Sequence, residues 1–518
     1  MSEVVLDGES LTPHEVERVA REGAPVSVSD DARERIRASR ERVEAAIDSG
    51  ESVYGLNTGF GHLVDTSIDP DDVETLQENL VRSHSAGVGR ELDPEEVRGL
   101  MVTRANTLAK GYSGIRPVVV DLLCDMLNAG VHPVVPSRGS LGASGDLAPL
   151  AHVASVLIGE GEALVDGTRY PGADALAAAD LTPVTLRAKE GLALINGTQL
   201  TVALAALVVV DAERVLDAVD AAGALTTEVT MGTTANCAPA VNAVRPHRGQ
   251  AESAKNVRLL TDGSEVIESH RNCDRVQDAY SIRCLPQVHG AVRDSVRHLR
   301  EAVEVELNSA TDNPLVFPPG DVDDRASGGE RAAVISAGNF HGEPLALRLD
   351  YTAGALTDLA AIAERRVDRM LNPDVQEPHL PPFLTEHSGL QSGLMIAQYT
   401  AAALLNECRS LGRPSLDSTP VSGGQEDHVS MSGQSALNAR TVLENVATVV
   451  GVELVCAAQG AEFIDDDLSL GDGTRETYDA VRELVPKPDA DRALSPDIEA
   501  ARDLARSDAF SALLDSLA

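Results

Sequence analysis

The run Gly139–His152, GSLGASGDLAPLAH, decides how the rest of the chain is interpreted. Apolar residues recur at helical spacing from Leu147 onward, which predicts a helix. Asp146 stands where an N-cap residue is expected, and a proline in the first turn of a helix is tolerated. The tripeptide Ala143–Gly145 is therefore expected where a loop enters a helix N-terminus, whose partial positive charge favours developing negative charge.

Three chemistries use a loop of this kind. A phosphate-binding loop needs a Gly-Lys pair, which the sequence lacks. A hydrolase nucleophile elbow needs Gly-x-Ser-x-Gly, but Asp146 replaces the second glycine. The third is backbone chemistry, because the unhindered amide nitrogen of Gly145 can close onto the carbonyl of Ala143. Loss of two waters, one of them from the Ser144 hydroxyl, would leave a methylidene on a five-membered ring, which is an electrophile.

The segment 142–151 resembles the signature of the histidine and aromatic amino acid ammonia-lyases. That family forms methylidene-imidazolone (MIO) from an Ala-Ser-Gly tripeptide. The resemblance extends over roughly Val53–Met431, most of the chain. It implies that Ala143, Ser144 and Gly145 form MIO autocatalytically, with no metal and no nucleotide cofactor.

Two segments before the tripeptide also resemble the family. The glycine-rich segment 53–61, VYGLNTGFG, is expected to be a mobile loop. The resemblance implies that it closes over the site and that Tyr54 is the catalytic base. His84 lies on an apolar helical stripe and would ordinarily be a core residue. The segment 83–89, SHSAGVG, resembles the histidine-specific form of the family, which implies that His84 contacts the substrate side chain.

The segment 277–283 suits the polar end of an amino acid, and Asn196 precedes it in the chain. Gln277, Tyr280 and Arg283 step by three and are expected to share a helix face. An arginine can hold a carboxylate through two hydrogen bonds. The resemblance implies that Asn196 and Tyr280 support MIO and the amine, and that Gln277 and Arg283 bind substrate.

Two further motifs, GNFHGEP at 338–344 and QEDHVSM at 425–431, complete the resemblance. It implies that Phe340 packs beside the cofactor and that Glu426 meets the imidazole together with His84. No metal is expected, because the chain has no His-Glu-x-x-His and the adjacent pair Asp427–His428 lacks ligand spacing.

The charge balance predicts an acidic surface suited to high salt. The 518 residues carry a net charge of −38 and include four lysines, while 43% of the residues are hydrophobic. Salt screens the resulting self-repulsion, so we expect a halophilic source. A surface for a basic partner is the alternative, but the acidic residues are spread along the chain. The sign of the charge argues against nucleic-acid binding.

Cysteine spacing and hydropathy favour a cytoplasmic, soluble protein. The six cysteines show no C-x-x-C pair, which indicates reduced thiols. The N-terminus has no basic segment followed by an apolar run. The most apolar stretch, 201–210, is about half the length of a bilayer span and is expected to be a buried helix.

The expected fold is mainly α. The resemblance implies a fumarase/aspartase-like architecture, with an N-terminal region at 1–225 that carries MIO and a long-helix central bundle with C-terminal helices at 226–518. A continuous helix is expected over about Lys189–Thr227. The dipeptide Asp166–Gly167 predicts a small hairpin or loop within Leu164–Leu181.

The resemblance implies deamination of L-histidine to trans-urocanate and ammonia, the first step of histidine degradation, by a homotetramer whose sites combine several subunits. One alternative is a tyrosine or phenylalanine ammonia-lyase or aminomutase with the same cofactor, against which His84 and the 425–428 segment argue. The other is a non-enzymatic acidic scaffold, against which the intact tripeptide, Tyr54 and Arg283 argue.

Overall fold

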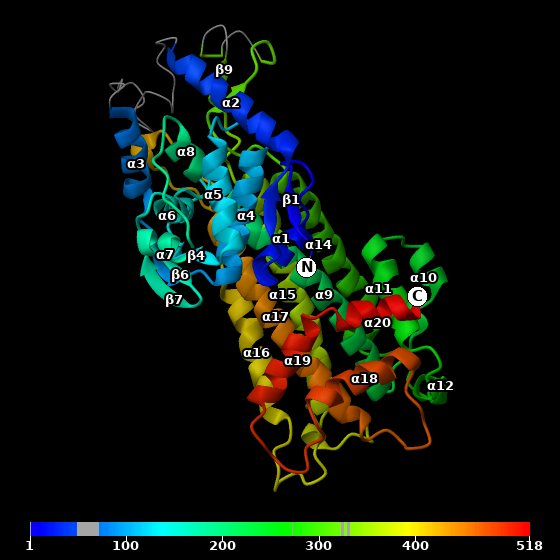
Figure 1. Ribbon diagram of the computed structural model, residues 1–518. Coiled ribbons are helices and arrows are strands. Elements are labelled where there is room, and N and C mark those ends of the chain that lie inside the picture. Colours follow the sequence, from blue (N-terminus) through cyan, green and yellow to red (C-terminus); the bar gives the residue numbers. More distant parts are fainter. Residues whose placement is uncertain (1, 49–71, 272, 323–325, 329–331) are drawn as a thin grey trace. The chain divides into compact units, whose positions relative to one another are not determined.

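The computed structural model describes residues 2–48, 72–271, 273–322, 326–328 and 332–518, and it is predominantly helical (Figure 1). The expected mainly α fold is confirmed, and the strands are short. Contacts divide the chain into two compact units. Unit 1 comprises Met1–Leu207, Leu299–Asp350 and Arg413–Leu437, and unit 2 comprises Val208–His298, Tyr351–Gly412 and Asn438–Ala518. The expected functional division at residue 225 stays a prediction.

Unit 1 contains the shorter helices of the N-terminal half and the strands. Its elements are β1 (Val4–Leu6), α1 (Pro13–Arg21), β2 (Val26–Val28), α2 (Asp30–Asp48), α3 (Val73–His84), β3 (Val88–Glu91), α4 (Pro94–Ala109), α5 (Pro117–Asn128), β4 (Val131–Pro133), β5 (Pro136–Arg138), α6 (Leu147–Leu157), β6 (Glu162–Val165), β7 (Thr168–Pro171), α7 (Gly172–Ala178), α8 (Glu190–Ile195), β8 (Leu315–Phe317), β9 (Ala333–Ile335), η6 (Pro414–Leu416) and η7 (Ser422–Gly424).

Four long helices each contain a boundary between the units, and a further boundary, at Gly412–Arg413, follows α16 (Met395–Ser410). The four are α9 (Gln199–Val229), α14 (Leu285–Leu307), α15 (Glu343–Leu371) and α17 (Ser432–Ala461). Unit 2 adds η3 (Ala235–Cys237), α10 (Pro239–Ala243), α11 (Arg248–Leu260), α12 (Glu265–Ser269), α13 (Tyr280–Arg283), η5 (Pro382–Leu384), α16 (Met395–Ser410), α18 (Asp472–Leu484), α19 (Ser495–Ala505) and α20 (Ala509–Leu517).

The strands form small sheets that fasten the helices of unit 1. Strands β1 and β2 pair in parallel, and β4, β6 and β7 form an antiparallel sheet. The expected hairpin is confirmed as β6–β7, with positive φ at both Asp166 and Gly167 as its two-residue turn requires. Strand β3 pairs with β5, directly before the Gly139–His152 run.

Two expected helices differ in the structure. The helix expected over Lys189–Thr227 is interrupted, because Asn196 is extended at φ −90° and ψ 112° and Gly197 has φ +151°. It is therefore two helices, α8 and α9. Gln277 does not share a helix face with Tyr280 and Arg283, because α13 begins only at Tyr280.

In the described part of the chain, α17 is the one helix whose length and composition would allow it to cross a membrane. Its most apolar window has a mean hydropathy of 1.6, and 83% of that window is buried inside the structure. Such burial is typical of a core helix, which passes the same length and composition test.

Candidate active site

The tripeptide Ala143–Gly145 lies in a tight turn that leads from β5 into α6. Gly145 has φ +75° and forms an isolated parallel bridge with Gly197, in the break between α8 and α9. The amide of Asp146 donates to the Gly197 carbonyl at 2.6 Å. A Cβ atom at Gly145 would approach the Gly197 backbone more closely than van der Waals contact allows. Glycine is therefore required at position 145, both for its conformation and for space.

Asn196 holds the same turn through a side-chain hydrogen bond. Its Nδ2 atom donates to the Ser144 carbonyl at 2.9 Å, and its side chain is almost fully buried. Its Oδ1 atom is also buried and has no hydrogen-bond partner among the described residues. A buried acceptor without a partner costs free energy, so one is usually explained by a group that it serves.

These observations fit the cofactor that the sequence resemblance implies. Ring closure needs a glycine amide that can bend back onto the carbonyl of residue 143, and the structure enforces glycine at position 145. Ala143 and Gly145 are buried, which shields the backbone from water, while Ser144 is half-buried. The unpaired Asn196 Oδ1 supplies an acceptor beside the same backbone.

Arg104 of α4 is the main support of the break between the two helices. Its guanidinium donates to the Asn196 carbonyl at 2.9 Å, to Gln199 Oε1 at 2.7 Å and to the Ala193 carbonyl. Burial lowers the pKa of Arg104 to about 10, which still leaves it charged at neutral pH. A charged group with several backbone carbonyls as partners fixes the path of Asn196 and Gly197.

Asp146 binds side chains and backbone outside its own helix, which corrects its expected role as a capping side chain. It occupies the N-cap position of α6 but makes no side-chain cap hydrogen bond. Its carboxylate instead accepts from Ser140 Oγ at 2.6 Å and from the Thr201 amide at 2.8 Å. Complete burial raises the pKa of Asp146, and these hydrogen bonds offset part of that effect.

The segment 429–432 packs directly against the turn. The Met431 amide donates to the Leu141 carbonyl at 2.7 Å, and Ser430 Oγ donates to the Gly142 carbonyl at 3.1 Å. Gly142 has φ +63°, and a Cβ atom there would collide with the hydroxyls of Ser430 and Ser432. The QEDHVSM motif is thus held against the turn, although it is almost 290 residues away in sequence.

Glu426 reaches the tripeptide itself. Ser144 Oγ donates to Glu426 Oε1 at 3.3 Å, and the Glu426 side chain is half-buried. This contact brings two of the predicted site residues together within unit 1. A carboxylate beside the serine hydroxyl is available to accept hydrogen bonds from a ligand.

His84 lies at the C-terminal end of α3 and interacts electrostatically with Glu426. Burial lowers the pKa of His84, and the Leu80 carbonyl and the Glu426 carboxylate offset part of that decrease. His84 Nδ1 donates to the Leu80 carbonyl at 2.8 Å. Because a carbonyl can only accept, the neutral ring carries its proton on Nδ1, and Nε2 is left as an acceptor.

Phe340 is half-buried in the segment that precedes α15. The neighbouring Gly342 packs tightly under Ser432, since a Cβ atom there would collide with the Ser432 hydroxyl. The GNFHGEP motif therefore shares the serine contacts of the turn. A position of Phe340 beside the cofactor stays a prediction.

Of the other four predicted site residues, the structure describes three, all of them in unit 2. Tyr54 falls within 49–71, outside the described residues. Gln277, Tyr280 and Arg283 belong to unit 2. There the Tyr280 side chain is 70% exposed, the Arg283 guanidinium carbon lies 4.7 Å from the Tyr280 ring centroid, and Gln277 is exposed. The catalytic and binding roles of all four residues stay predictions.

Three charged residues of this region were not singled out from the sequence. One is Arg104, and the other two form a fully buried pair, with Lys189 Nζ and Asp312 Oδ2 2.9 Å apart. The sequence does offer one signal for Lys189, since it is one of only four lysines and stands shortly before the apolar segment 191–195. Asp312 lies in the turn at 308–315, where its side chain is also fully buried.

Comparison with known proteins defines the class. A model of the family described as "Aromatic amino acid lyase" matches residues 11–483. The chain belongs to this family. It is 66% identical to a protein of Halobacterium salinarum named "Probable histidine ammonia-lyase", over 99% of this chain and 98% of the relative.

Solved structures agree with this classification. The structure of histidine ammonia-lyase from Trypanosoma cruzi is 40% identical with a TM-score of 0.90, covering 99% of this chain and 95% of that one. Tyrosine aminomutase from Streptomyces globisporus is 40% identical with a TM-score of 0.92, covering 99% and 98%. The resemblance to histidine ammonia-lyases and the expected mainly α lyase fold are confirmed.

Proposed function

We propose that this protein deaminates L-histidine to trans-urocanate and ammonia, as the first step of histidine degradation. The observation that carries the proposal is the hydrogen bond between Ser144 Oγ and Glu426 Oε1 at 3.3 Å. It joins the residue from which the electrophile would form to a carboxylate suited to an imidazole. The names of the relatives support the same substrate.

We propose that Ala143, Ser144 and Gly145 form MIO, which would supply an electrophile that activates the substrate for loss of ammonia. The chain's part is to shape and hold this tripeptide. Gly197 excludes any side chain at position 145, and Asn196 Nδ2 holds the Ser144 carbonyl. Asn196 Oδ1 is left as a buried acceptor at the same place.

His84 and Glu426 would select the substrate ring. With its proton on Nδ1, His84 presents an acceptor at Nε2, and the Glu426 carboxylate is also an acceptor. A neutral imidazole ring has one N–H group to donate and a protonated ring has two, whereas a phenyl ring has none. A phenyl substrate that displaces water would leave these half-buried acceptors without partners, at a cost of about 1–3 kcal/mol for each one.

The remaining groups would act on the amino acid end. Tyr54 is assigned as the base that takes the β-proton, which requires surroundings that lower its pKa. Arg283 would hold the carboxylate and Tyr280 would support the amine, with Gln277 and Phe340 contacting the substrate. The cation–π contact of Arg283 with Tyr280 supports a joint role for these two residues.

We further propose a cytoplasmic homotetramer from a halophilic source, with sites shared between subunits. The large exposure of Tyr280 in the single chain, 70%, supports completion of the site by another copy. Six free cysteines support a reducing compartment. The net charge of −38 supports function at high salt and argues against nucleic-acid partners.

The test is product formation from a panel of substrates. Purified protein in molar KCl should produce urocanate from L-histidine, followed by its ultraviolet absorbance, and no product from L-tyrosine or L-phenylalanine. Formation of an α,β-unsaturated acid or a β-amino acid from tyrosine or phenylalanine, without turnover of histidine, would replace this proposal with an aromatic lyase or aminomutase. No turnover of any of the three would favour the non-enzymatic scaffold.

A further inference from the structure

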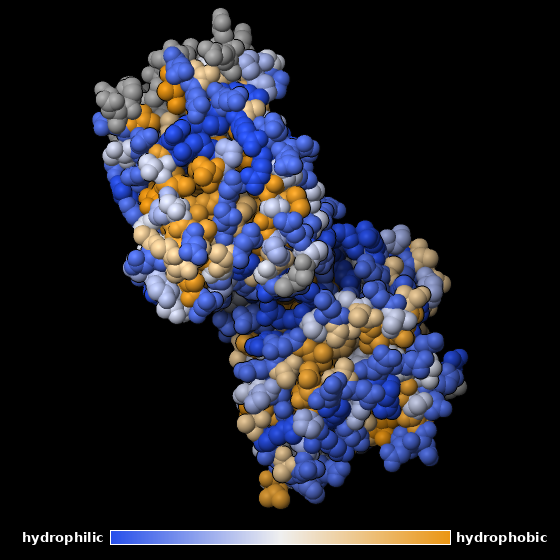
Figure 2. Space-filling model, in the orientation of Figure 1, coloured by the Kyte–Doolittle hydropathy of each residue, from blue (hydrophilic) through white to orange (hydrophobic). Residues whose placement is uncertain are grey.

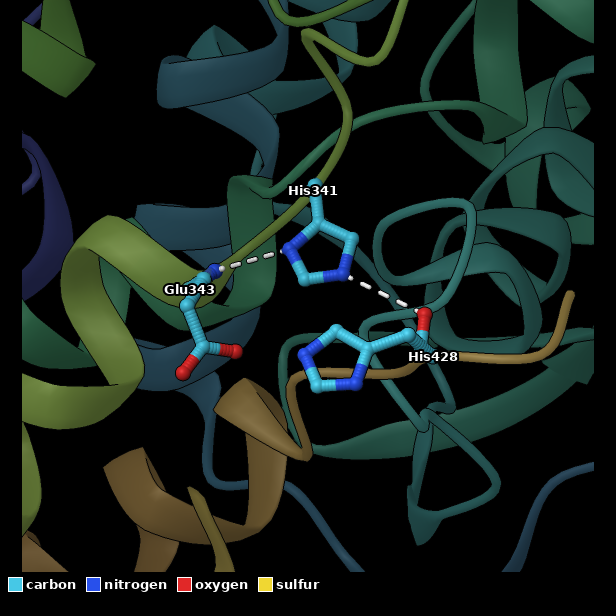
Figure 3. A group of neighbouring side chains, drawn as sticks. All are labelled: His341, Glu343 and His428. Atoms are coloured by element: carbon cyan, nitrogen blue, oxygen red, sulfur yellow. Dashed lines mark hydrogen bonds between the residues drawn. The ribbon is translucent and has the colours of Figure 1, made fainter. Parts of the chain in front are cut away.

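Two histidines and a glutamate from the GNFHGEP and QEDHVSM motifs converge in unit 1. His341, Glu343 and His428 each offer a potential ligand atom, and these atoms all lie within 4.8 Å of one another. The two imidazole rings stack with their centroids 5.8 Å apart and their planes at 1° (Figure 3). None of these three residues has a role in the proposed reaction.

One oxygen of the half-buried Glu343 side chain lacks a hydrogen-bond partner. Its Oε2 atom is buried, and within the described parts of the chain no group donates a hydrogen bond to it. An ionised oxygen removed from water is costly unless a positive charge or a donor compensates it. Figure 3 shows the Glu343 carboxylate beside the His428 ring, so a cation there would face the carboxylate and an imidazole together.

The hydrogen bonds of His341 set which of its nitrogens is available. The Glu343 amide donates to His341 Nδ1 at 3.3 Å, so this nitrogen carries a lone pair. Nε2 therefore carries the proton and donates to the His428 carbonyl at 3.3 Å. A histidine whose second nitrogen donates to a backbone carbonyl is in the state typical of a metal ligand. A metal bond at Nδ1 would replace this long contact with the Glu343 amide.

We propose that His341 Nδ1, a Glu343 carboxylate oxygen and a ring nitrogen of His428 bind a divalent transition metal ion such as Zn²⁺ or Co²⁺. Two imidazoles and one carboxylate suit these ions better than Mg²⁺ or Ca²⁺, which prefer oxygen ligands. Bond lengths of about 2.0–2.2 Å require the ligand atoms to move closer together, and the exposed His428 side chain has room to do so.

The ion would join the segment that carries Phe340 to the segment that carries Glu426. The expectation of no metal rested on short-range spacing, whereas these ligands come from segments 85 or more residues apart. Glu343 is the first residue of α15, and the helix fixes the position of its backbone.

Metal binding is tested directly on the tag-free, full-length protein, without any activity measurement. The protein is stripped with a chelator, transferred to molar KCl with excess Mg²⁺ to occupy exposed carboxylates, and titrated with Co²⁺. We expect one Co²⁺ for each chain after gel filtration, with the visible absorption of a nitrogen-ligated ion. Glu343→Gln and His428→Ala should each weaken binding at least tenfold, because each removes a direct ligand and even the loss of a partner behind a ligand costs about 10–100-fold.

The matched control is His387→Ala, which removes an exposed histidine outside the cluster and should leave Co²⁺ binding unchanged. Melting curves of the metal-free variants show whether each is folded, and at least the exposed His428 position should tolerate alanine. The proposal is overturned if the wild-type protein retains no Co²⁺ in the presence of Mg²⁺, or if the folded Glu343 and His428 variants bind it as the wild type does.

Discussion

At the scale of single residues, the chemistry of the candidate site depends on which polar atoms already have a hydrogen-bond partner. His84 Nδ1 is used by the Leu80 carbonyl, and Asn196 Nδ2 is used by the Ser144 carbonyl. What remains for a ligand is a set of acceptors: His84 Nε2, Asn196 Oδ1 and the Glu426 carboxylate. The two acceptors assigned to the substrate ring, His84 Nε2 and the Glu426 carboxylate, favour a side chain that donates hydrogen bonds.

Glu426 is the residue on which substrate choice depends most. Glu426→Ala should lower kcat/KM for L-histidine by roughly tenfold to a hundredfold if the carboxylate only binds the ring, and by several orders of magnitude if it also assists catalysis. The exposed neighbour in Gln425→Ala is the control and should change little. Steady-state kinetics measure kcat/KM for both variants, and melting curves show whether each is folded. A wild-type kcat/KM in the Glu426 variant would contradict a role of Glu426 in substrate binding.

At the scale of elements, the sequence predicted the pieces of the site better than their arrangement. The hairpin β6–β7 and helix α6 follow from local turn chemistry and apolar spacing. The break between α8 and α9 was not predicted, because apolar residues at helical spacing stand on both sides of it, although Asn196–Gly197 is a dipeptide typical of turns. Arg104 and the bridge between Gly145 and Gly197 hold this break. By contrast, no local signal shows that Ser430 lies against Gly142.

Unit 2 is fastened by a buried charge network that joins four long helices. Arg366 of α15 donates to both carboxylate oxygens of Glu453 of α17, at 2.5 and 2.8 Å. Arg366 also donates to His289 Nε2 at 3.1 Å, while His289 Nδ1 donates to Asp220 of α9 at 2.8 Å. Burial is the largest cause that lowers the pKa of His289, from 6.5 to about 4.

This lowered pKa makes unit 2 sensitive to acid. Because unfolded His289 binds a proton more tightly, stability is retained above pH 6.5 and lost as the pH falls toward about 4. The interval corresponds to roughly 3 kcal/mol at about 1.36 kcal/mol for each pH unit. Denaturant unfolding across this range should show a shallower pH dependence for His289→Gln than for the wild type. The exposed His298 on the same helix supplies the control, His298→Gln; equal slopes in the wild type and the His289 variant would contradict the account.

At the scale of the whole molecule, the large negative charge determines how stability depends on salt. The net charge is −38, and hydrophilic residues cover much of the face seen in Figure 2, interrupted by apolar patches. The Debye length is about 30 Å at 0.01 M salt and about 3 Å at 1 M, so repulsion between surface carboxylates is strong only at low salt. The fold and any assembly built from it should therefore depend on salt.

Desalting should destabilise the protein. The melting temperature should rise with KCl concentration up to the molar range, and activity should be lost on desalting as the assembly dissociates or unfolds. Differential scanning fluorimetry together with gel filtration at several KCl concentrations measures both effects. A melting temperature that is flat or falls with added KCl would show that the acidic surface is not an adaptation to salt.

The central claim is that the turn at Ala143–Gly145 becomes an electrophile on which the reaction depends. Its most direct test is the intact mass of purified protein, measured on the same sample whose turnover of L-histidine has been recorded. We predict an active chain two waters lighter than its sequence implies, and a Ser144→Ala chain that regains one or both waters and has lost turnover. Active wild-type protein of unmodified mass would contradict it.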